Sequence, residues 1–599
     1  MVTVPFTQLN RPIRVDTELG PDVLLLTGFN GTEAVSRPFA FQLDLLSIHP
    51  DVDPAALLRK PVLVTVRLDN GEKRYVHGLC SRFSQGHQRD SLTSYRAEIV
   101  PWLWFLQLSR ESRIYQNLTV PEIIEQVFQR LGYSDFDNRL RRSYLPRTYC
   151  VQYRETHFDF ISRLAEEEGI FYFFEHTEEK HVLVLCDDNN VSEPGPAAET
   201  ARFTMEDSRT QEVIWALERE HAVHIGMVTL SDYDPLQPTL DLERSEGEAE
   251  FEEVYDYPGR YTEPEAGEHL ARIWLEAEEA ERQLVRGEGN VRGLVPGYHF
   301  TLSEHYRRDL NTKYVVTQVQ HLASSGQFRA WEADTPLDYR NTFTAIPHDV
   351  PYRPRRRTPR PLIHGSQSAL VVGPPGEEIH ADKYGRIKVQ FYWDRDGQRD
   401  ENSSCWIRVT TPWGGKGYGS VSIPRIGNEV LVAFEEGDPD RPIVIGSVYN
   451  ADQMPPFELP GAGIQMGMKS RSSPGGGGNN EITMTDTKGK ELLNINAQYD
   501  MKTTVGHDDT QSVTNDRKVT VDGTHTETIK KDASITISEG NLTLSVVDGT
   551  ADINVKKAVG EKFDATQTTT VKKKITISSE EADVHVKAAT EIKLEVGNS

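Results

Sequence analysis

The segment from Val505 to Ile537, VGHDDTQSVTNDRKVTVDGTHTETIKKDASITI, repeats with a period of eight residues. An apolar residue recurs at every eighth position, and threonine, lysine, aspartate and glycine fill the positions between. Apolar pairs two positions apart indicate short strands with one buried face. We therefore predict a solenoid of strands and turns. Its predicted core positions are Val505, Val513, Val521, Ile529, Ile537, Ile553 and Ile577, with slips at Ser545, Glu561 and Thr569.

An eight-residue unit is too short for one chain to close a layer around a core, since solenoid units usually run about 20 to 45 residues. Three units must therefore share each layer. They could be successive units of one chain or one unit from each of three chains, and the spacing is compatible with both. In the second case residues 481–599 would bury almost nothing alone, so folding and trimerisation would be one event.

The region before the repeat, residues 362–455, contains five β-type runs separated by turns, which predicts a small five-stranded barrel of the OB type. The runs are Ala369–Gly373, Ile387–Phe391, Cys405–Val409, Glu429–Phe434 and Ile443–Gly446. Residues 351–361 are rich in proline and arginine and are predicted to form a stiff, extended linker. Residues 456–480 are predicted to form a connector of proline and glycine.

The first 350 residues are predicted to be mainly β, with strands such as 62–68, 170–174 and 314–319. Two helices are indicated by capping residues. Thr119 with Glu122 opens one, and Thr156 with Asp159 opens another that closes at Gly169. A third helix is predicted from Pro264 to Arg286.

The composition indicates a folded protein of several domains, because 26% of its 599 residues are charged and 37% are hydrophobic. The start of the chain lacks the pattern of a signal peptide, and no apolar stretch is long enough for a membrane span. A formal charge of −25 disfavours nonspecific binding to nucleic acid. Four scattered cysteines without metal-type spacing are predicted to be small buried hydrophobes.

Several sequence blocks resemble a known family. The first region contains YRETHFDFISRLAEEEGIFYFF (153–174) and YDYPGRY (255–261). The OB region contains EEIH (377–380), DKYGR (382–386), WDR (393–395), SSCW (403–406), PRIGNEV (424–430) and EGDPDRP (436–442). Together these blocks resemble the VgrG proteins of type VI secretion systems, which are similar to the fused hub and spike of contractile phage tails.

The resemblance implies a mainly β protein with three parts, and it favours the three-chain stalk. We name the parts the hub (1–350, barrel-like modules with a few helices), the neck (362–455, an OB fold) and the stalk (481–599, a trimeric β-helix or β-prism). The implied function is that of a structural spike in a contractile injection machine. The implied partners are two further copies of the chain, a tube of Hcp-like protein, baseplate proteins, and effectors or their adaptor chaperones.

The resemblance also implies a route for the spike. It would assemble in the bacterial cytoplasm, leave through the type VI system to the exterior or into a target cell, and contact membranes only transiently as it punctures them. Strand-like alternation of Ile592, Leu594 and Val596 continues almost to Ser599 without a cap. A small PAAR-repeat protein is therefore expected to dock on these three residues.

No catalytic, cofactor-binding or metal-binding residues are predicted, and the protein is not expected to be an enzyme. His221 and His224 form HxxH without the glutamate of a metalloprotease. The glycine-rich stretch Gly414–Gly419 lacks the spacing of a phosphate loop and predicts a flexible or tight loop. The acidic runs Glu166–Glu168 and Glu276–Glu281 are interpreted as solvated helix faces. Only a short segment separates the neck from the stalk, so a lysozyme domain like that of the related phage spike does not fit there.

Other interpretations remain compatible with parts of the sequence. A phage-derived tail spike would share every module. A spike with a catalytic domain after the stalk would carry that domain outside this sequence, and an adhesin would need recognition loops that the sequence does not indicate. The neck offers aromatic residues for stacking on a nucleic acid strand, but Glu435, Glu436, Asp438 and Asp440 are expected to repel its phosphates.

Overall fold

The computed structural model describes residues 6–89, 91–189, 195, 198–206, 211–248, 250, 252–326 and 337–597. The chain divides into two units between Met501 and Lys502, and each is described by itself. Asn598 and Ser599, which follow the predicted tip residues, lie outside the described residues.

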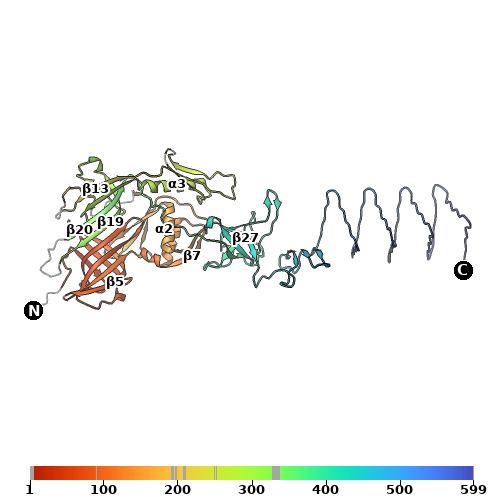
Figure 1. Cartoon of the computed structure of the whole chain (residues 1–599), viewed down its shortest axis with the longest axis horizontal. Helices are drawn as coiled ribbons and strands as arrows, with labels where there is room; N and C mark the ends of the chain where they lie inside the picture. The colour runs from red at the N-terminus through yellow and green to blue at the C-terminus, as the bar shows by residue number, and fades with distance from the viewer. Residues whose placement is uncertain are drawn as a thin grey trace. The chain divides into compact units, whose positions relative to one another are not determined.

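The hub is built on a twelve-stranded sheet in the order β1-β4-β5-β6-β3-β2-β19-β20-β17-β13, to which β12 and β18 attach through β19 (Figure 1). Alternation along the strands positions its core: Phe41 and Leu43 of β3 are buried, whereas Gln42 and Asp44, which alternate with them, are exposed. The strands are β1 (Ile13–Thr17), β2 (Leu25–Ala34), β3 (Arg37–Ser47), β4 (Pro61–Arg67), β5 (Lys73–Arg89), β6 (Leu92–Val100), β12 (Thr200–Arg202), β13 (Ile214–His221), β17 (Gln283–Gly289), β18 (His299–Ser303), β19 (Lys313–Ser324) and β20 (Asp338–Pro347).

Two capped helices complete the first hub core, as predicted. Helix α1 (Val120–Arg130) opens with a capping box in which Thr119 and Glu122 exchange hydrogen bonds. Helix α2 (His157–Glu168) is capped by Thr156 and ends at the left-handed Gly169. Their apolar faces pack with the sheet residues in one core. The neighbouring strands are β7 (Arg110–Tyr115), β8 (Phe136–Asn138), β9 (Cys150–Thr156), β10 (Phe171–His176) and β11 (His181–Cys186), and short 3-10 turns lie at Pro54–Ala56 and Trp102–Leu108.

The third helix is shorter than predicted. Helix α3 (Pro264–Glu279) stops before Arg286, which lies in β17. Its last turn is acidic and contains no basic residue, an arrangement that the helix dipole disfavours. The helix packs on a small sheet of β14 (Met227–Leu230), β15 (Arg244–Gly247) and β16 (Glu253–Asp256).

The neck contains the five predicted strands in the order β22-β21-β26-β27-β23. A bridge between Ile387 and Ile407, with N–O distances of 2.9 and 2.8 Å, joins the two ends of this order and closes the barrel. The predicted glycine loop is a tight hairpin of β24 (Gly414–Gly415) and β25 (Tyr418–Gly419). The barrel strands are β21 (Gln367–Val372), β22 (Lys388–Phe391), β23 (Arg408–Val409), β26 (Glu429–Phe434) and β27 (Pro442–Val448).

A three-stranded antiparallel sheet follows the neck, formed by β28 (Gln465–Lys469), β29 (Glu481–Thr485) and β30 (Leu492–Asn496). Strand β28 lies inside the predicted 456–480 connector, so that segment is not only proline and glycine coil. Beyond it, no helix or strand occurs among residues 502–597, which form an open zigzag with regular bends (Figure 1).

Candidate functional site

The loop that follows β26 holds the neck against the hub. Asp440 Oδ1 accepts a hydrogen bond from the Val151 amide at 2.7 Å, and Asp438 Oδ2 accepts one from Arg260 Nε at 2.6 Å. A further ion pair joins Arg441 to Asp232 in the hub. The three sequence blocks around residues 153–174, 255–261 and 436–442 therefore meet at one place, which we call the hub–neck joint.

The joint is a buried ionic network. Glu167 of α2 accepts a hydrogen bond from Arg147 at 2.7 Å and is ion-paired with Arg360 at 2.8 Å, and its side chain is 5% exposed. Burial alone would raise the pKa of Glu167, but Arg360 and Arg147, together with Arg163, hold it well below its usual range. Burial instead raises the pKa of Asp440 to about 7, and neighbouring Asp438 adds to the effect. Asp438 and Asp440 thus face inward and do not present an acidic surface to a nucleic acid.

The proline- and arginine-rich segment forms no helix or strand, and its arginines are bound to the hub along its length. We call residues 353–360 the strap. Arg353 pairs with Glu276 at 2.8 Å, Arg355 and Arg357 pair with Glu281 at 2.7 and 2.9 Å, and the Arg356 guanidinium lies 4.6 Å from the centre of the Trp274 ring.

The interpretation of the two acidic runs, Glu166–Glu168 and Glu276–Glu281, as solvated helix faces is therefore wrong. Glu166 accepts hydrogen bonds from Thr358 at 2.8 and 2.9 Å, and Glu167 is buried in the joint. Their partners in the strap lie between about 75 and 195 residues away along the chain, so the run of glutamates alone does not reveal them.

The sheet β28-β29-β30 presents an unpartnered apolar face that the sequence analysis missed. Directly opposed residues share a face, and the register aligns six apolar side chains on one side of the sheet. All six are between 42% and 73% exposed. They are Met466, Met468, Ile482, Met484, Leu493 and Ile495, and we call them the apolar face. Their strict alternation within three short runs is the signal that could have revealed it.

The predicted stalk core residues occupy two different places in the repeat. Val505, Val513, Val521, Ile529 and Ile537 each directly precede a bend and are 48–53% exposed. Two nine-residue units then shift the register, with bends at 538–540 and 547–549. As a result Val546, Val555, Phe563 and Val571 take the pre-bend place. Ile553 and Ile577 lie two residues before it and are 85% and 76% exposed.

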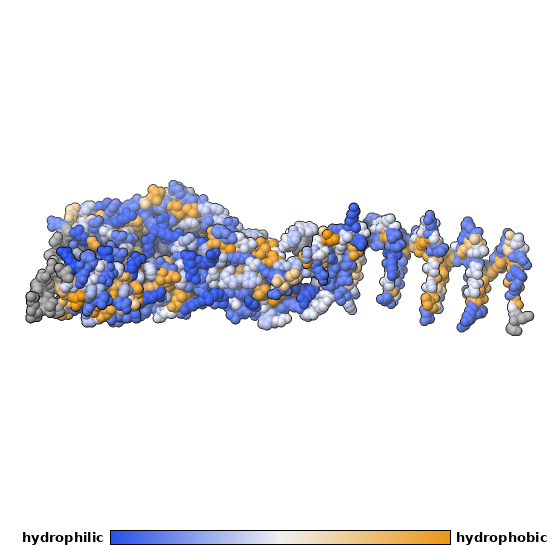
Figure 2. Space-filling view, turned by 60° about the horizontal axis from the view of Figure 1, so that its bottom comes forward, coloured by the Kyte–Doolittle hydropathy of each residue, from blue (hydrophilic) through white to orange (hydrophobic). Residues whose placement is uncertain are grey.

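Every residue from 498 to 597 is exposed in the single chain, and Figure 2 shows apolar residues in view along the turns of this segment (Figure 2). Ile592, Leu594 and Val596 are exposed as well. The structure thus brings none of the predicted stalk or tip residues into contact with a core.

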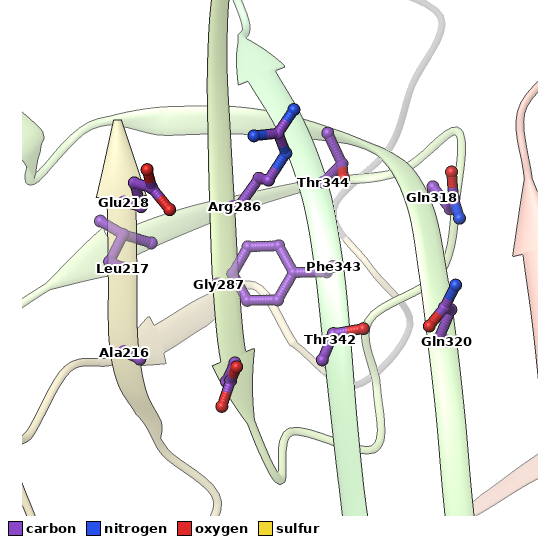
Figure 3. Close-up of a pocket in the computed structure, with 11 residues that line it drawn as sticks. Ala216, Leu217, Glu218, Arg286, Gly287, Gln318, Gln320, Thr342, Phe343 and Thr344 are labelled. Carbon is purple, nitrogen blue, oxygen red and sulfur yellow. The ribbon is translucent and has the colours of Figure 1, made fainter. Parts of the chain in front are cut away.

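A cavity of about 370 Å³ lies on one face of β13, β17, β19 and β20. Figure 3 shows mainly polar side chains around it, including Glu218, Arg286 and Thr342, with the Phe343 ring over Gly287 (Figure 3). Among the described residues, no group of three or more His, Cys, Asp or Glu side chains is arranged to hold a metal ion. His221 ends a strand and His224 follows in a loop, so the two share no helical face.

The order of these parts is that of the hub-and-spike proteins of contractile tails, and sequence profiles of three such families match. They are the phage tail baseplate hub (residues 32–327), the type VI secretion system/phage-baseplate injector OB domain (377–449) and the bacteriophage T4 gp5 C-terminal trimerisation domain (466–591). The apolar face and the repeat both fall within the last match.

Characterised relatives narrow the class to one family. The chain is 44% identical over 522 residues to the type VI secretion system spike protein VgrG1b of Pseudomonas aeruginosa, covering 85% of this chain and 70% of that protein. It is also 44% identical over 518 residues to VgrG1a of the same organism, covering 84% and 80%. The chain belongs to the VgrG family of type VI secretion spike proteins, and it is a structural spike of a contractile injection system.

Solved structures show the same fold at low identity. The E. coli c3393 protein, a type VI secretion component similar to T4 gp27 and gp5, aligns with a TM-score of 0.54 at 24% identity, over 73% of this chain and all of that one. A chain of the lidded Francisella PdpA-VgrG complex aligns with a TM-score of 0.51 at 10% identity, over 80% of this chain and 73% of that one. No helix in the described part of the chain combines the length and hydropathy required to cross a bilayer.

Proposed function

We propose that three copies of this chain form a rigid tip whose stalk folds only as the copies intertwine. The apolar face carries this proposal, because six exposed apolar side chains on one sheet need a cover of similar chemistry. Equivalent faces of two further copies supply that cover around a threefold axis. The proposed axis-facing positions are the pre-bend residues of the stalk, with Ile553 and Ile577 on the same strand face two residues away.

The hub and the joint fit a part that transmits thrust. Buried ion pairs join hub to neck, and the strap ties the connecting segment to α2 and α3. In the assembled machine the trimeric hub would sit on a tube of Hcp-like protein among baseplate proteins, and sheath contraction would drive it through a membrane. The spike would assemble in the bacterial cytoplasm and leave through the type VI system.

The proposed cargo contacts are of two kinds. Ile592, Leu594 and Val596 would dock one PAAR-repeat protein per trimer, because an apolar threefold cross-section offers one site. Effectors or their adaptor chaperones would bind the spike directly, a use supported by the Francisella VgrG solved in complex with PdpA. We propose that the chain itself is no enzyme and acts mechanically, in keeping with relatives that are named as spike proteins.

The experiment that tests this function measures the mass of the assembly and its binding to two proposed partners. Light scattering coupled to chromatography should give the mass of three chains at micromolar concentration, and the trimer should co-sediment with preformed Hcp tubes and capture the cognate PAAR protein. A monomer at that concentration would refute the trimeric spike. A trimer that ignores both tube and PAAR protein would refute the assigned partners while leaving the assembly intact.

A further inference from the structure

Four buried histidines lie between the hub sheet and the hairpin β10-β11. His77 comes from β5, His176 from β10, His181 from β11 and His321 from β19. They surround two apolar rings and one carboxylate. The Phe39 ring lies 4.9 Å from the His176 ring and the Phe41 ring stacks on the His321 ring at 5.7 Å, while Glu33 approaches both His176 and His321. We call this group the histidine seam.

The hydrogen bonds of the seam fix one proton on each ring of the His77–His181 pair. The Trp102 amide donates to His181 Nε2 at 2.9 Å, so the single proton of a neutral His181 must sit on Nδ1. That nitrogen lies 3.0 Å from His77 Nδ1, which must therefore accept and leave the His77 proton on Nε2. A second proton on either ring would place two N–H groups face to face and break one of these bonds.

His176 has room for a proton but no free counter-charge. Its Nδ1 is 3.1 Å from the His77 amide nitrogen and 3.2 Å from the His77 carbonyl oxygen, so it can accept from one or donate to the other. Its Nε2 makes no hydrogen bond within the described part of the chain and lies 3.7 Å from Glu33 Oε1.

The carboxylates around the seam are already neutralised. Glu33 is paired with Arg74 and accepts from His321 Nε2 at 2.8 Å, while His321 Nδ1 bonds the Tyr339 hydroxyl at 2.7 Å. The other nearby carboxylate is Asp135, which acts on His77 and is paired with Lys180 at 2.9 Å. An added proton therefore creates an uncompensated buried charge.

We propose that the histidine seam is an acid-sensitive fastening of the hub, which holds β5 to the hairpin β10-β11 at neutral pH and releases it in acid. The seam is the kind of neutral histidine cluster whose protonation opens an interface. A spike that enters an acidic compartment would loosen its hub there, whereas it stays rigid in the neutral cytoplasm where it assembles.

The pKa shifts agree with this direction. Burial lowers the pKa of His176 from 6.5 to about 4, and burial also lowers those of His77 and His181. Between pH 6.5 and about 4 these histidines therefore bind protons in the unfolded chain but stay neutral in the folded chain. The stability that neutral histidines provide is complete above pH 6.5 and falls as the pH drops through this window. Glu33, with a pKa lowered to about 2, contributes its own loss only below pH 4.5.

The test compares hydrogen exchange of the full-length protein at pH 7.5 and 5.0, corrected for the intrinsic effect of pH. His77→Asn keeps an acceptor for His181, and His181→Gln keeps one for Trp102, so the double variant retains hydrogen-bonding groups that cannot be protonated. His87→Asn, at an exposed position of the same strand, is the matched control.

We expect amides in 73–80 and 171–186 to exchange at least about tenfold faster at pH 5.0 in the wild type and control, and less so in the double variant. Equal acid sensitivity in the double variant would overturn the proposal. Should that variant not fold, imidazole C2-proton exchange on the wild type decides: seam histidines that titrate near pH 6.5 while 73–80 and 171–186 stay protected would refute it, and a depressed titration coupled to opening would support it.

Discussion

Substitution of Leu493 by aspartate isolates the contribution of the apolar face. Leu493 is the second residue of β30, lies opposite Met484, and is 62% exposed in the single chain. Burying a whole leucine side chain contributes about 1.5–3 kcal/mol, so burying the exposed part in an assembly contributes about 1–2 kcal/mol per copy. Three copies give about 3–6 kcal/mol per trimer.

The aspartate variant loses this term and places three carboxylates near one axis, where like charges repel. Since 1.4 kcal/mol corresponds to a factor of ten, the trimer should weaken by at least about two to four powers of ten. Sedimentation equilibrium or mass photometry over a dilution series from micromolar to nanomolar chain would measure the shift.

The neighbouring Asn494 provides a matched control, because it lies on the opposite, polar face of the same strand. Asn494→Asp adds the same charge and should leave the trimer unchanged. If Leu493→Asp dissociated over the same concentrations as the wild type, the apolar face would not be a trimer interface. If both variants weakened the trimer equally, charge alone would explain the result.

Three further changes test the joint and the stalk. Glu167→Gln removes the buried carboxylate that pairs with Arg147 and with the half-buried Arg360, so urea denaturation should show an unfolding free energy lower by about 3–5 kcal/mol; a loss under about 1 kcal/mol would indicate a solvated pair. Val521→Asp should abolish a heat- or detergent-resistant trimer on gels, and an unchanged trimer would mean that Val521 does not face the axis. Asp440→Asn keeps an oxygen for the Val151 amide but cannot ionise. Because burial raises the pKa of Asp440, its stabilising neutral form is lost as pH rises through about 7. The variant's gain in melting temperature should thus be larger at pH 8.5 than at pH 5, and an equal gain would contradict this.

Local features of the fold could be predicted from the sequence. The caps at Thr119 and Thr156 are set by residues three positions apart, so both helices begin where expected. The barrel strands of the neck could also be predicted, because each is a short apolar run between turn residues. Helix α3 ends before the predicted Arg286 because residues 283–289 form β17, which pairs with β13 and β20, and these distant partners are not visible in the local apolar period.

Long-range pairing could not be predicted in the same way. The strap joins glutamates far away in the chain, and no local pattern distinguishes an arginine bound to a helix from one in solvent. The predicted register of the stalk was wrong after Ile537 for a different reason. Gly540 and Gly549, with φ of 108° and 139°, each allow a three-residue bend, which adds one residue to a unit and moves the apolar position with it.

The complete exposure of residues 498–597 in one chain also has a genetic consequence. In the proposed stalk each layer draws one strand from each of three copies, so a single defective copy disrupts every layer that it enters. A cell that makes intact and Val521→Asp chains in equal amounts would assemble only about one trimer in eight from intact chains alone. Stalk mutations of this kind are therefore expected to be dominant over the wild-type allele, whereas a hub defect that keeps a chain out of the assembly would be recessive.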